Sequence, residues 1–346
     1  MLDAVGPECA SLGLGRRCVV LTDSNVGPLY ADRVLTSLRK AGFDPFLLTV
    51  PAGERSKNLS LTRRLLEQMA EAGLERGSFL VALGGGVVGD LGGFLAATYM
   101  RGIRFVQVPT SLLAQVDSSV GGKVGVNLRA GKNLVGAFHQ PVAVFCDTAT
   151  LRTLPERELR AGMSEVIKYG AIADERLFRR LEREVDRALA LEMDVLDEVI
   201  ARCCAIKARV VARDEREGGL RAILNFGHTI GHALEAITGY GRYLHGEAVA
   251  VGQVAAGWIS SRLLGLPEKD VQRLEHLLER AGLPTQVRWT EERLQRLLEA
   301  MRRDKKVQGG QVRFVLLRRL GKAEWGHTVS EEVIRWALMD RKGTAR

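Results

Sequence analysis

FLVALGGGVVGDLGG (79–93) carries the most informative pattern in the first half of this sequence. Its first residues form a short, continuous apolar run, which is typical of a strand buried on both faces of a parallel sheet. Glycines follow at once and lead into an apolar helix, so backbone N–H groups at the helix start can approach a phosphate closely. The cluster follows the third predicted strand and departs from the usual dinucleotide fingerprint. On its own it fits phosphate binding and tight strand–helix packing equally well.

The segments around this stretch repeat the same alternation of strand and helix. Strands are predicted at 17–23, 45–50, 79–86, 105–111 and 142–148, with helices at 31–41, 58–72 and 87–99. This order predicts a parallel sheet covered by helices on both faces, with ligands at the carboxyl ends of its strands. After Pro155 the pattern is helical nearly to the end, apart from a predicted hairpin within 309–325. We therefore predict an α/β fold, with an N-terminal parallel-sheet domain at 1–150 and an α-helical domain at 151–346.

A long polar segment at 111–141 separates the fourth and fifth predicted strands. It is rich in glycine and serine and contains Asp117, Lys123, Lys132 and Asn133. Polar, glycine-punctuated segments of this length are usually functional loops or linkers. Two lysines beside Asp and Asn favour a loop that binds an anion. An edge hairpin at 124–128 is the structural alternative, and both can hold.

Composition excludes several classes of protein. The chain has 346 residues, of which 46% are hydrophobic and 26% charged, and a net charge of +9. The arginines are spread over helix faces, which favours attraction of small anions over nucleic-acid binding. We expect no membrane segment, because no apolar run approaches the roughly 20 residues a membrane helix needs. We expect no secretion signal, because the N-terminus lacks a charged region followed by an apolar one. Five scattered cysteines without a CxxC motif indicate a reducing cytoplasm rather than a disulfide framework.

Three histidines gather in LNFGHTIGHALEAITGYGRYLHGEAVAVG (224–252). His228 and His232 stand at i and i+4 of a predicted helix and so share one face, and His245 opens the next helix. An i, i+4 pair alone more often decorates a helix surface. The third histidine, together with the polar residues Asn225 and Glu247, favours a divalent-metal site over surface histidines. HTIGH lacks the Glu of the HExxH motif, so a metalloprotease is not indicated.

A second charged pair lies in GMSEVIKYG (162–170). Glu165 and Lys168, at i and i+3, share a helix face in an otherwise apolar stretch. A surface salt bridge is the simple interpretation and contributes little. Burial is the alternative, and it would require the carboxylate to meet a cation. Glu165 is then the natural ligand to join the histidines.

Seven motifs occur here in an order that we recognise: GGGVVGD, VPTSLLAQVDSSVGGKVGVN, GKNLVGAFHQP, SEVIKYG, LNFGHTIGHALE, HGEAVAVG and a late DKK. Over residues 19–325 the chain resembles the 3-dehydroquinate synthase family. The resemblance implies a Rossmann-like N-terminal domain, an α-helical C-terminal domain, a tightly held NAD, one Zn2+ or Co2+ per chain and a homodimer.

The resemblance also implies the reaction. The family is a group of carbon–oxygen lyases that convert 3-deoxy-D-arabino-heptulosonate 7-phosphate (DAHP), an anionic sugar acid phosphate, to 3-dehydroquinate and phosphate, the second step of the shikimate pathway. The implied steps are transient NAD-linked oxidation at C5, phosphate elimination, re-reduction, ring opening and an intramolecular aldol.

Residue roles follow from the matching motifs. The implied metal ligands are Glu165, His228 and His245. The implied NAD contacts are Asp23, Glu54, Lys57, Gly85, Gly86, Val87, Asp90, Thr110, Ser111, Asp117, Lys123 and Lys132. The implied substrate and catalytic residues are Arg101, Asp117, Lys123, Lys132, Asn133, Lys168, Lys207, Arg221, Asn225 and His232. One lysine of the Lys305–Lys306 pair is also implied; Lys305 is taken as its representative, and the sequence does not distinguish the two. His232 is expected to shuttle a proton, and Arg101 to reach across a dimer interface.

Three alternatives remain. Another sugar phosphate cyclase, such as a 2-deoxy-scyllo-inosose or 2-epi-5-epi-valiolone synthase, would share the NAD and metal chemistry; Arg221, Asn225 and the Lys132–Asn133 pair favour the dehydroquinate pattern. A metal-dependent polyol dehydrogenase would release NADH and has no need for so many lysines. A nucleic-acid-binding module is the weakest alternative.

Overall fold

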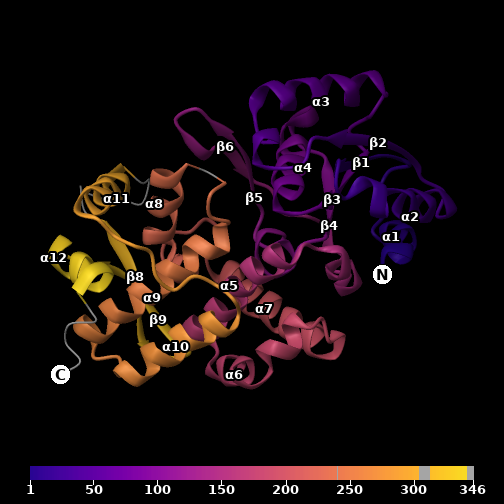
Figure 1. Cartoon of the computed structure of the whole chain (residues 1–346). Helices are drawn as coiled ribbons and strands as arrows, with labels where there is room; N and C mark the ends of the chain where they lie inside the picture. Colours follow the sequence, from indigo (N-terminus) through magenta and orange to yellow (C-terminus); the bar gives the residue numbers. More distant parts are fainter. Residues whose placement is uncertain (240, 304–311, 341–346) are drawn as a thin grey trace. The chain divides into compact units, whose positions relative to one another are not determined.

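The computed structural model describes residues 1–239, 241–303 and 312–340 (Figure 1). The chain divides into two compact units, Met1–Leu154 and Pro155–Arg346. Within the described residues, no helix is both long and apolar enough to cross a membrane.

A five-stranded parallel sheet forms the centre of the N-terminal unit. Its strands run in the order β2-β1-β3-β4-β7, and every neighbouring pair is parallel. They are β1 (Arg17–Asp23), β2 (Asp44–Val50), β3 (Phe79–Gly84), β4 (Arg104–Pro109) and β7 (Ala143–Val144). The predicted strand at 142–148 is therefore only two residues long. The other four strands lie where the apolar runs predicted them.

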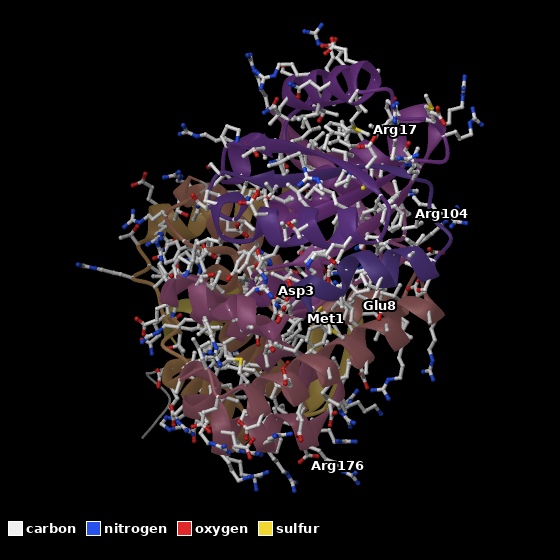
Figure 2. The ribbon with its side chains drawn as sticks, turned by 90° about the vertical axis from the view of Figure 1, so that its right-hand side faces the viewer. Met1, Asp3, Glu8, Arg17, Arg104 and Arg176 are labelled. Carbon is white, nitrogen blue, oxygen red and sulfur yellow. The ribbon has the colours of Figure 1, made fainter. Side chains whose placement is uncertain are left out.

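Helices cover both faces of this sheet because successive strand residues point to opposite sides. Val19 and Leu21 of β1 join a core with α3 (Leu59–Glu71) and α4 (Gly86–Thr98), whereas Cys18 and Val20 join a second core with α1 (Val5–Ser11) and α2 (Gly27–Lys40) (Figure 1). Helix α1 was not predicted from the sequence. The Met1 amine lies 3.0 Å from the Asp147 carboxylate, and Arg104 donates to the carbonyl of Leu12 (3.1 Å), so both ends of this segment are anchored (Figure 2).

The glycine cluster of α4 serves packing in its second half. A methyl group at Gly92 would lie 3.0 Å from the Ala82 side chain of β3, and one at Gly93 would lie 2.3 Å from Val124. Any side chain there would push the helix from the sheet. Gly85 and Gly86, at the start of α4, do not make such contacts with the sheet. The second half of the cluster thus serves tight packing, and phosphate binding at its start stays a prediction.

The polar segment after β4 forms a hairpin of its own. Its strands, β5 (Lys123–Leu128) and β6 (Gly131–Phe138), pair antiparallel as a separate two-stranded sheet rather than as an edge of the main sheet. Val124 and Val126 anchor it in the core shared with α3 and α4.

The C-terminal unit is largely helical. Its helices are α5 (Glu156–Ala173), α6 (Glu175–Leu189), α7 (Met193–Arg213), α8 (His228–Thr238), α9 (His245–Leu264), α10 (Glu268–Arg280), α11 (Glu291–Arg303) and α12 (Glu331–Arg335). The predicted hairpin is present as β8 (Arg313–Arg319) and β9 (Lys322–Thr328). The α/β fold class, with the parallel sheet first and the helical region second, is confirmed.

Candidate functional site

Three imidazoles converge in the C-terminal unit. His228 and His232 lie one turn apart on α8, with ring centroids 5.3 Å apart, and His245 is the first residue of α9. The ring of His245 lies 5.2 Å from that of His228 and 5.7 Å from that of His232. One nitrogen from each ring falls within 4.8 Å of the others, a spacing that could hold a metal ion.

Glu165 of α5 faces the same cluster. Its side chain is 0% exposed, and Oε1 lies 3.6 Å from His228 Nε2 and 4.0 Å from His245 Nε2. Oε1 has no hydrogen-bond partner among the described residues, whereas Oε2 accepts from the Lys168 ammonium. A buried carboxylate oxygen without a donor is costly. A cation beside Oε1 would remove that cost, so the residues present fit a divalent metal.

The ring of His228 is held in a suitable tautomer. Its Nδ1 lies 3.1 Å from the carbonyl oxygen of Phe226, which can only accept a hydrogen bond. We therefore assign the proton of the neutral ring to Nδ1. The lone pair on Nε2 then faces Glu165, which is the arrangement of a metal-binding imidazole.

The predicted anion-binding residues of this unit lie on α7 and on η6 (Leu220–Asn225). Lys207 and Arg221 are buried, and the Arg221 guanidinium donates to the backbone oxygen of Glu215. The Asn225 amide donates to Glu217 (2.7 Å). The two glutamates were not predicted, and they position the side chains of Arg221 and Asn225.

The carboxyl ends of adjacent strands meet in the N-terminal unit. Asp23 ends β1 and Thr110 follows β4, and both strands flank β3, after which Gly85 and Gly86 open α4. One oxygen of Asp23 accepts from two backbone N–H groups at the start of α2 (2.8 and 2.9 Å). A methyl group at Gly86 would lie 3.1 Å from the Ser118 hydroxyl, so a side chain there would crowd the first turn of α4. That turn suits a phosphate.

A hydrogen-bonded network joins four predicted residues and includes one, Asn127, that was not predicted. Lys57, 3% exposed, donates to Asp90 (2.6 Å) and to Asn133 Oδ1 (2.7 Å). Asn127 donates to Glu54 (2.8 Å) and accepts from the backbone N–H of Asn133 (2.8 Å). Asn127 ends the VGVN run, and its chemistry alone did not distinguish it from a turn residue.

The other predicted residues have these places. Val87 lies in the first turn of α4, Ser111 next to Thr110, Asp117 in η4 (Ala114–Ser118), Lys123 at the start of β5, Lys132 in β6, and Arg101 is the exposed last residue of η3 (Tyr99–Arg101). Lys305 and Lys306 lie outside the described residues.

Comparison with known proteins covers almost the whole chain. Residues 47–161 match the family model for the 3-dehydroquinate synthase N-terminal region, and residues 162–307 match the model for the C-terminal region. The chain is 52% identical over 316 residues to the 3-dehydroquinate synthase of Thermoanaerobacter pseudethanolicus, covering 91% of this chain and 88% of that protein. It is 50% identical over 332 residues to that of Desulforamulus reducens, covering 96% and 92%.

The chain belongs to the 3-dehydroquinate synthase family. The resemblance is thereby confirmed, and so is its implied activity: the chain is a 3-dehydroquinate synthase by function, a lyase of the shikimate pathway.

Solved structures of related cyclases share the fold. A 2-epi-5-epi-valiolone synthase from Streptomyces hygroscopicus, with NAD+ and Zn2+ bound, is 25% identical with a TM-score of 0.88, covering 96% of this chain and 92% of that one. A 2-deoxy-scyllo-inosose synthase in complex with carbaglucose-6-phosphate, NAD+ and Co2+ is 30% identical with a TM-score of 0.86, covering 96% and 94%. A probable glycerol dehydrogenase from Sinorhizobium meliloti, 19% identical with a TM-score of 0.68, shares the fold alone.

Proposed function

We propose that the chain converts DAHP to 3-dehydroquinate and phosphate with a recycled NAD and one divalent metal, Zn2+ or Co2+. The family match supports the reaction, and the single observation that carries the metal is the buried Glu165 Oε1, which faces His228 and His245 and has no hydrogen-bond donor among the described residues. The solved cyclases with NAD+ and Zn2+ or Co2+ bound support both cofactors.

We assign the metal to Glu165, His228 and His245, and not to the three histidines together. The three-histidine group meets the spacing of a metal site, but it would leave the buried Glu165 oxygen without a cation. An anionic ligand also balances part of the metal charge in a buried site. A bound divalent cation would supply a Lewis acid that polarises a substrate hydroxyl or carbonyl.

The other predicted site residues of the C-terminal unit bind substrate and transfer protons in this proposal. Lys168 holds Glu165 through Oε2 and so fixes the direction of Oε1. His232 is half-buried beside the proposed ligands, where its ring can exchange a proton with a substrate oxygen. Lys207 and Arg221 are buried cations suited to the carboxylate and phosphate of DAHP.

We assign NAD to the predicted N-terminal domain, 1–150, and the metal and substrate to the predicted C-terminal domain, 151–346. NAD would supply the hydride acceptor. The open first turn of α4 at Gly85–Gly86 suits its pyrophosphate. The Lys57 network positions Glu54 and Asp90 at the same end of α4.

The expected assembly is a homodimer in the cytoplasm. Arg101 is exposed on a turn with left-handed backbone (φ 67°), as is Met100 (φ 49°). Such backbone costs about 1–2 kcal/mol per residue, which supports a functional reason for this presentation of Arg101. None of the five cysteines, all of which lie in the described residues, forms a disulfide, which is consistent with a reducing compartment.

The deciding experiment measures phosphate release from DAHP with trace NAD+ and Zn2+ while NADH absorbance is followed. Phosphate in excess of NAD+, without net NADH, is the expected result. NADH accumulating without phosphate would indicate a dehydrogenase. If DAHP gives neither phosphate nor NADH but another sugar phosphate releases phosphate, the cofactor assignment stands and the substrate assignment is refuted.

Single substitutions test the ligand set. His245→Ala and Glu165→Gln should abolish retention of the metal and turnover, with circular dichroism close to that of the unaltered chain. His232→Ala should retain one metal per chain and lose turnover. Loss of metal in His232→Ala with retention in Glu165→Gln would establish the three-histidine set instead.

A further inference from the structure

We infer that Glu235 is a positioning residue for His245: it fixes the tautomer and the direction of this ring so that Nε2 is available to a cation. The inference rests on the metal site proposed above. Neither the sequence motifs nor the comparisons assign Glu235 a role.

The geometry joins two consecutive helices. Glu235 stands seven residues after His228 on α8, about two helical turns, and so on the same face. Its side chain is nearly buried, at 5% exposed, and Oε2 lies 3.0 Å from His245 Nδ1. An ionised carboxylate only accepts hydrogen bonds, so Nδ1 carries the proton. Nε2 is then left with its lone pair, 4.0 Å from Glu165 Oε1.

His228 shows the same arrangement with a different acceptor. There a backbone carbonyl, that of Phe226, holds Nδ1 at 3.1 Å. Each ring is therefore held by a hydrogen bond from Nδ1, and each directs Nε2 to the same oxygen, Glu165 Oε1. Each ring belongs to the first residue of its helix, but the side chain of His245 is 30% exposed against 9% for His228, so packing restrains it less. A charged acceptor, which forms the stronger hydrogen bond, stands behind the less restrained ring.

A purely structural pair between α8 and α9 is the competing interpretation. Glycines already fix the approach of these helices without Glu235. A methyl group at Gly231 would lie 3.0 Å from the Val249 backbone, and one at Gly252 would lie 1.9 Å from the Gly227 carbonyl oxygen. Because backbone contact sets the helix spacing, the pair is better explained by what it does to the His245 ring.

The two interpretations differ in what they predict for metal affinity. Loss of a carboxylate behind a metal-bound histidine typically weakens metal binding about 10- to 100-fold. We therefore expect Glu235→Ala to weaken Co2+ affinity within that range. Glu235→Gln should lose less, since its amide oxygen can still accept the Nδ1 proton but carries no charge. Co2+ affinity is measured on the full chain by competition with a chelator, and the visible absorption of bound Co2+ reports on its ligand geometry.

The matched control is Glu247→Gln. Glu247 is two residues after His245, but its carboxylate bonds to Arg157 (2.7 Å) and to the backbone N–H of Leu244 (2.9 Å). Glutamine can keep the second of these bonds. Co2+ affinity and spectrum should therefore match those of the unaltered chain.

Three outcomes decide the matter. Weaker Co2+ binding and an altered spectrum in both Glu235 variants, with the control unchanged, support the inference. Unchanged affinity, with or without a lower unfolding midpoint, overturns it and leaves the metal site intact. If the unaltered chain binds no Co2+ tightly, or if His245→Ala still binds it, the proposed metal site fails and the inference fails with it. Should Glu235→Ala not fold, the isosteric Glu235→Gln decides alone.

Discussion

Gly252 offers a sharp test of how the fold sets the histidine cluster. It lies inside α9, where a methyl group would fall 1.9 Å from the carbonyl oxygen of Gly227 and 3.0 Å from the backbone nitrogen of Gly231. Both obstacles are backbone atoms of the α8 region, so the side chain cannot be accommodated by a rotamer change. α8 would have to move, and Gly227 directly precedes His228.

Two opposing contributions determine the change in unfolding free energy of Gly252→Ala. Glycine to alanine inside a helix gains about 1 kcal/mol in intrinsic helix propensity. Overpacking a core costs about 1–3 kcal/mol, and backbone obstacles place Gly252→Ala at the upper end of that range. The expected net loss is about 2 kcal/mol of unfolding free energy, or roughly 4–8 °C in Tm for a unit of this size.

Gly257→Ala is the internal control, on the same helix. A methyl group there would meet a Val271 methyl at 3.1 Å, which a small side-chain shift relieves. The helix-propensity gain is the same, so the net effect should be near zero or slightly stabilising. Thermal and urea unfolding of the two variants, with Co2+ affinity measured alongside, isolates the backbone clash. Gly252→Ala with stability equal to that of Gly257→Ala would refute this account of the α8–α9 contact.

Two further predictions concern titratable groups. Burial alone would raise the pKa of the Glu247 carboxyl, but the Arg157 guanidinium and a backbone N–H outweigh it and hold that pKa below its usual value of 4.5. The stabilisation by ionised Glu247 is therefore complete above about pH 4.5 and is lost as the pH falls below that value. The difference in unfolding free energy between the unaltered chain and Glu247→Gln should accordingly become smaller in acid. A difference that stays constant with pH would contradict this prediction. Burial raises the pKa of the Cys9 and Cys18 thiols to about 12, so a thiol reagent at mildly alkaline pH should label them only in urea. Rapid labelling of either thiol in the folded chain would show that its environment is more open than described.

Local patterns predicted the elements of the sheet better than their arrangement. Apolar runs gave β1 to β4 within a residue or two, because strands buried on both faces must be apolar throughout. The order β2-β1-β3-β4-β7 depends on which strands pair across long separations, which no local pattern records. The segment at 142–148 is apolar enough for a strand, yet only Ala143 and Val144 pair with β4.

The site residues also differ in whether a local sequence pattern predicted them. Glu165 and Lys168 were found from the sequence because a charged pair inside an apolar helix face signals burial. Glu235 lies in a helix whose two histidines already had a predicted role, and its burial became evident only from the fold. Asn127 was missed for a related reason, since an asparagine at a strand end is ordinary turn chemistry.

Buried polar groups therefore differ in how far the sequence reveals them. A charge that meets its partner one helical turn away, as Lys168 meets Glu165, leaves a local pattern. Groups that meet theirs across the fold leave none: Glu235 reaches His245 over a helix boundary, and Asn127 reaches Glu54 from another element. Such long-range polar contacts still have to be satisfied, because a polar group buried without a partner costs about 1–3 kcal/mol. The partners of a binding residue are thus under the same physical constraint as the residue itself, and Glu235 is the one on which the direction of a proposed metal ligand depends.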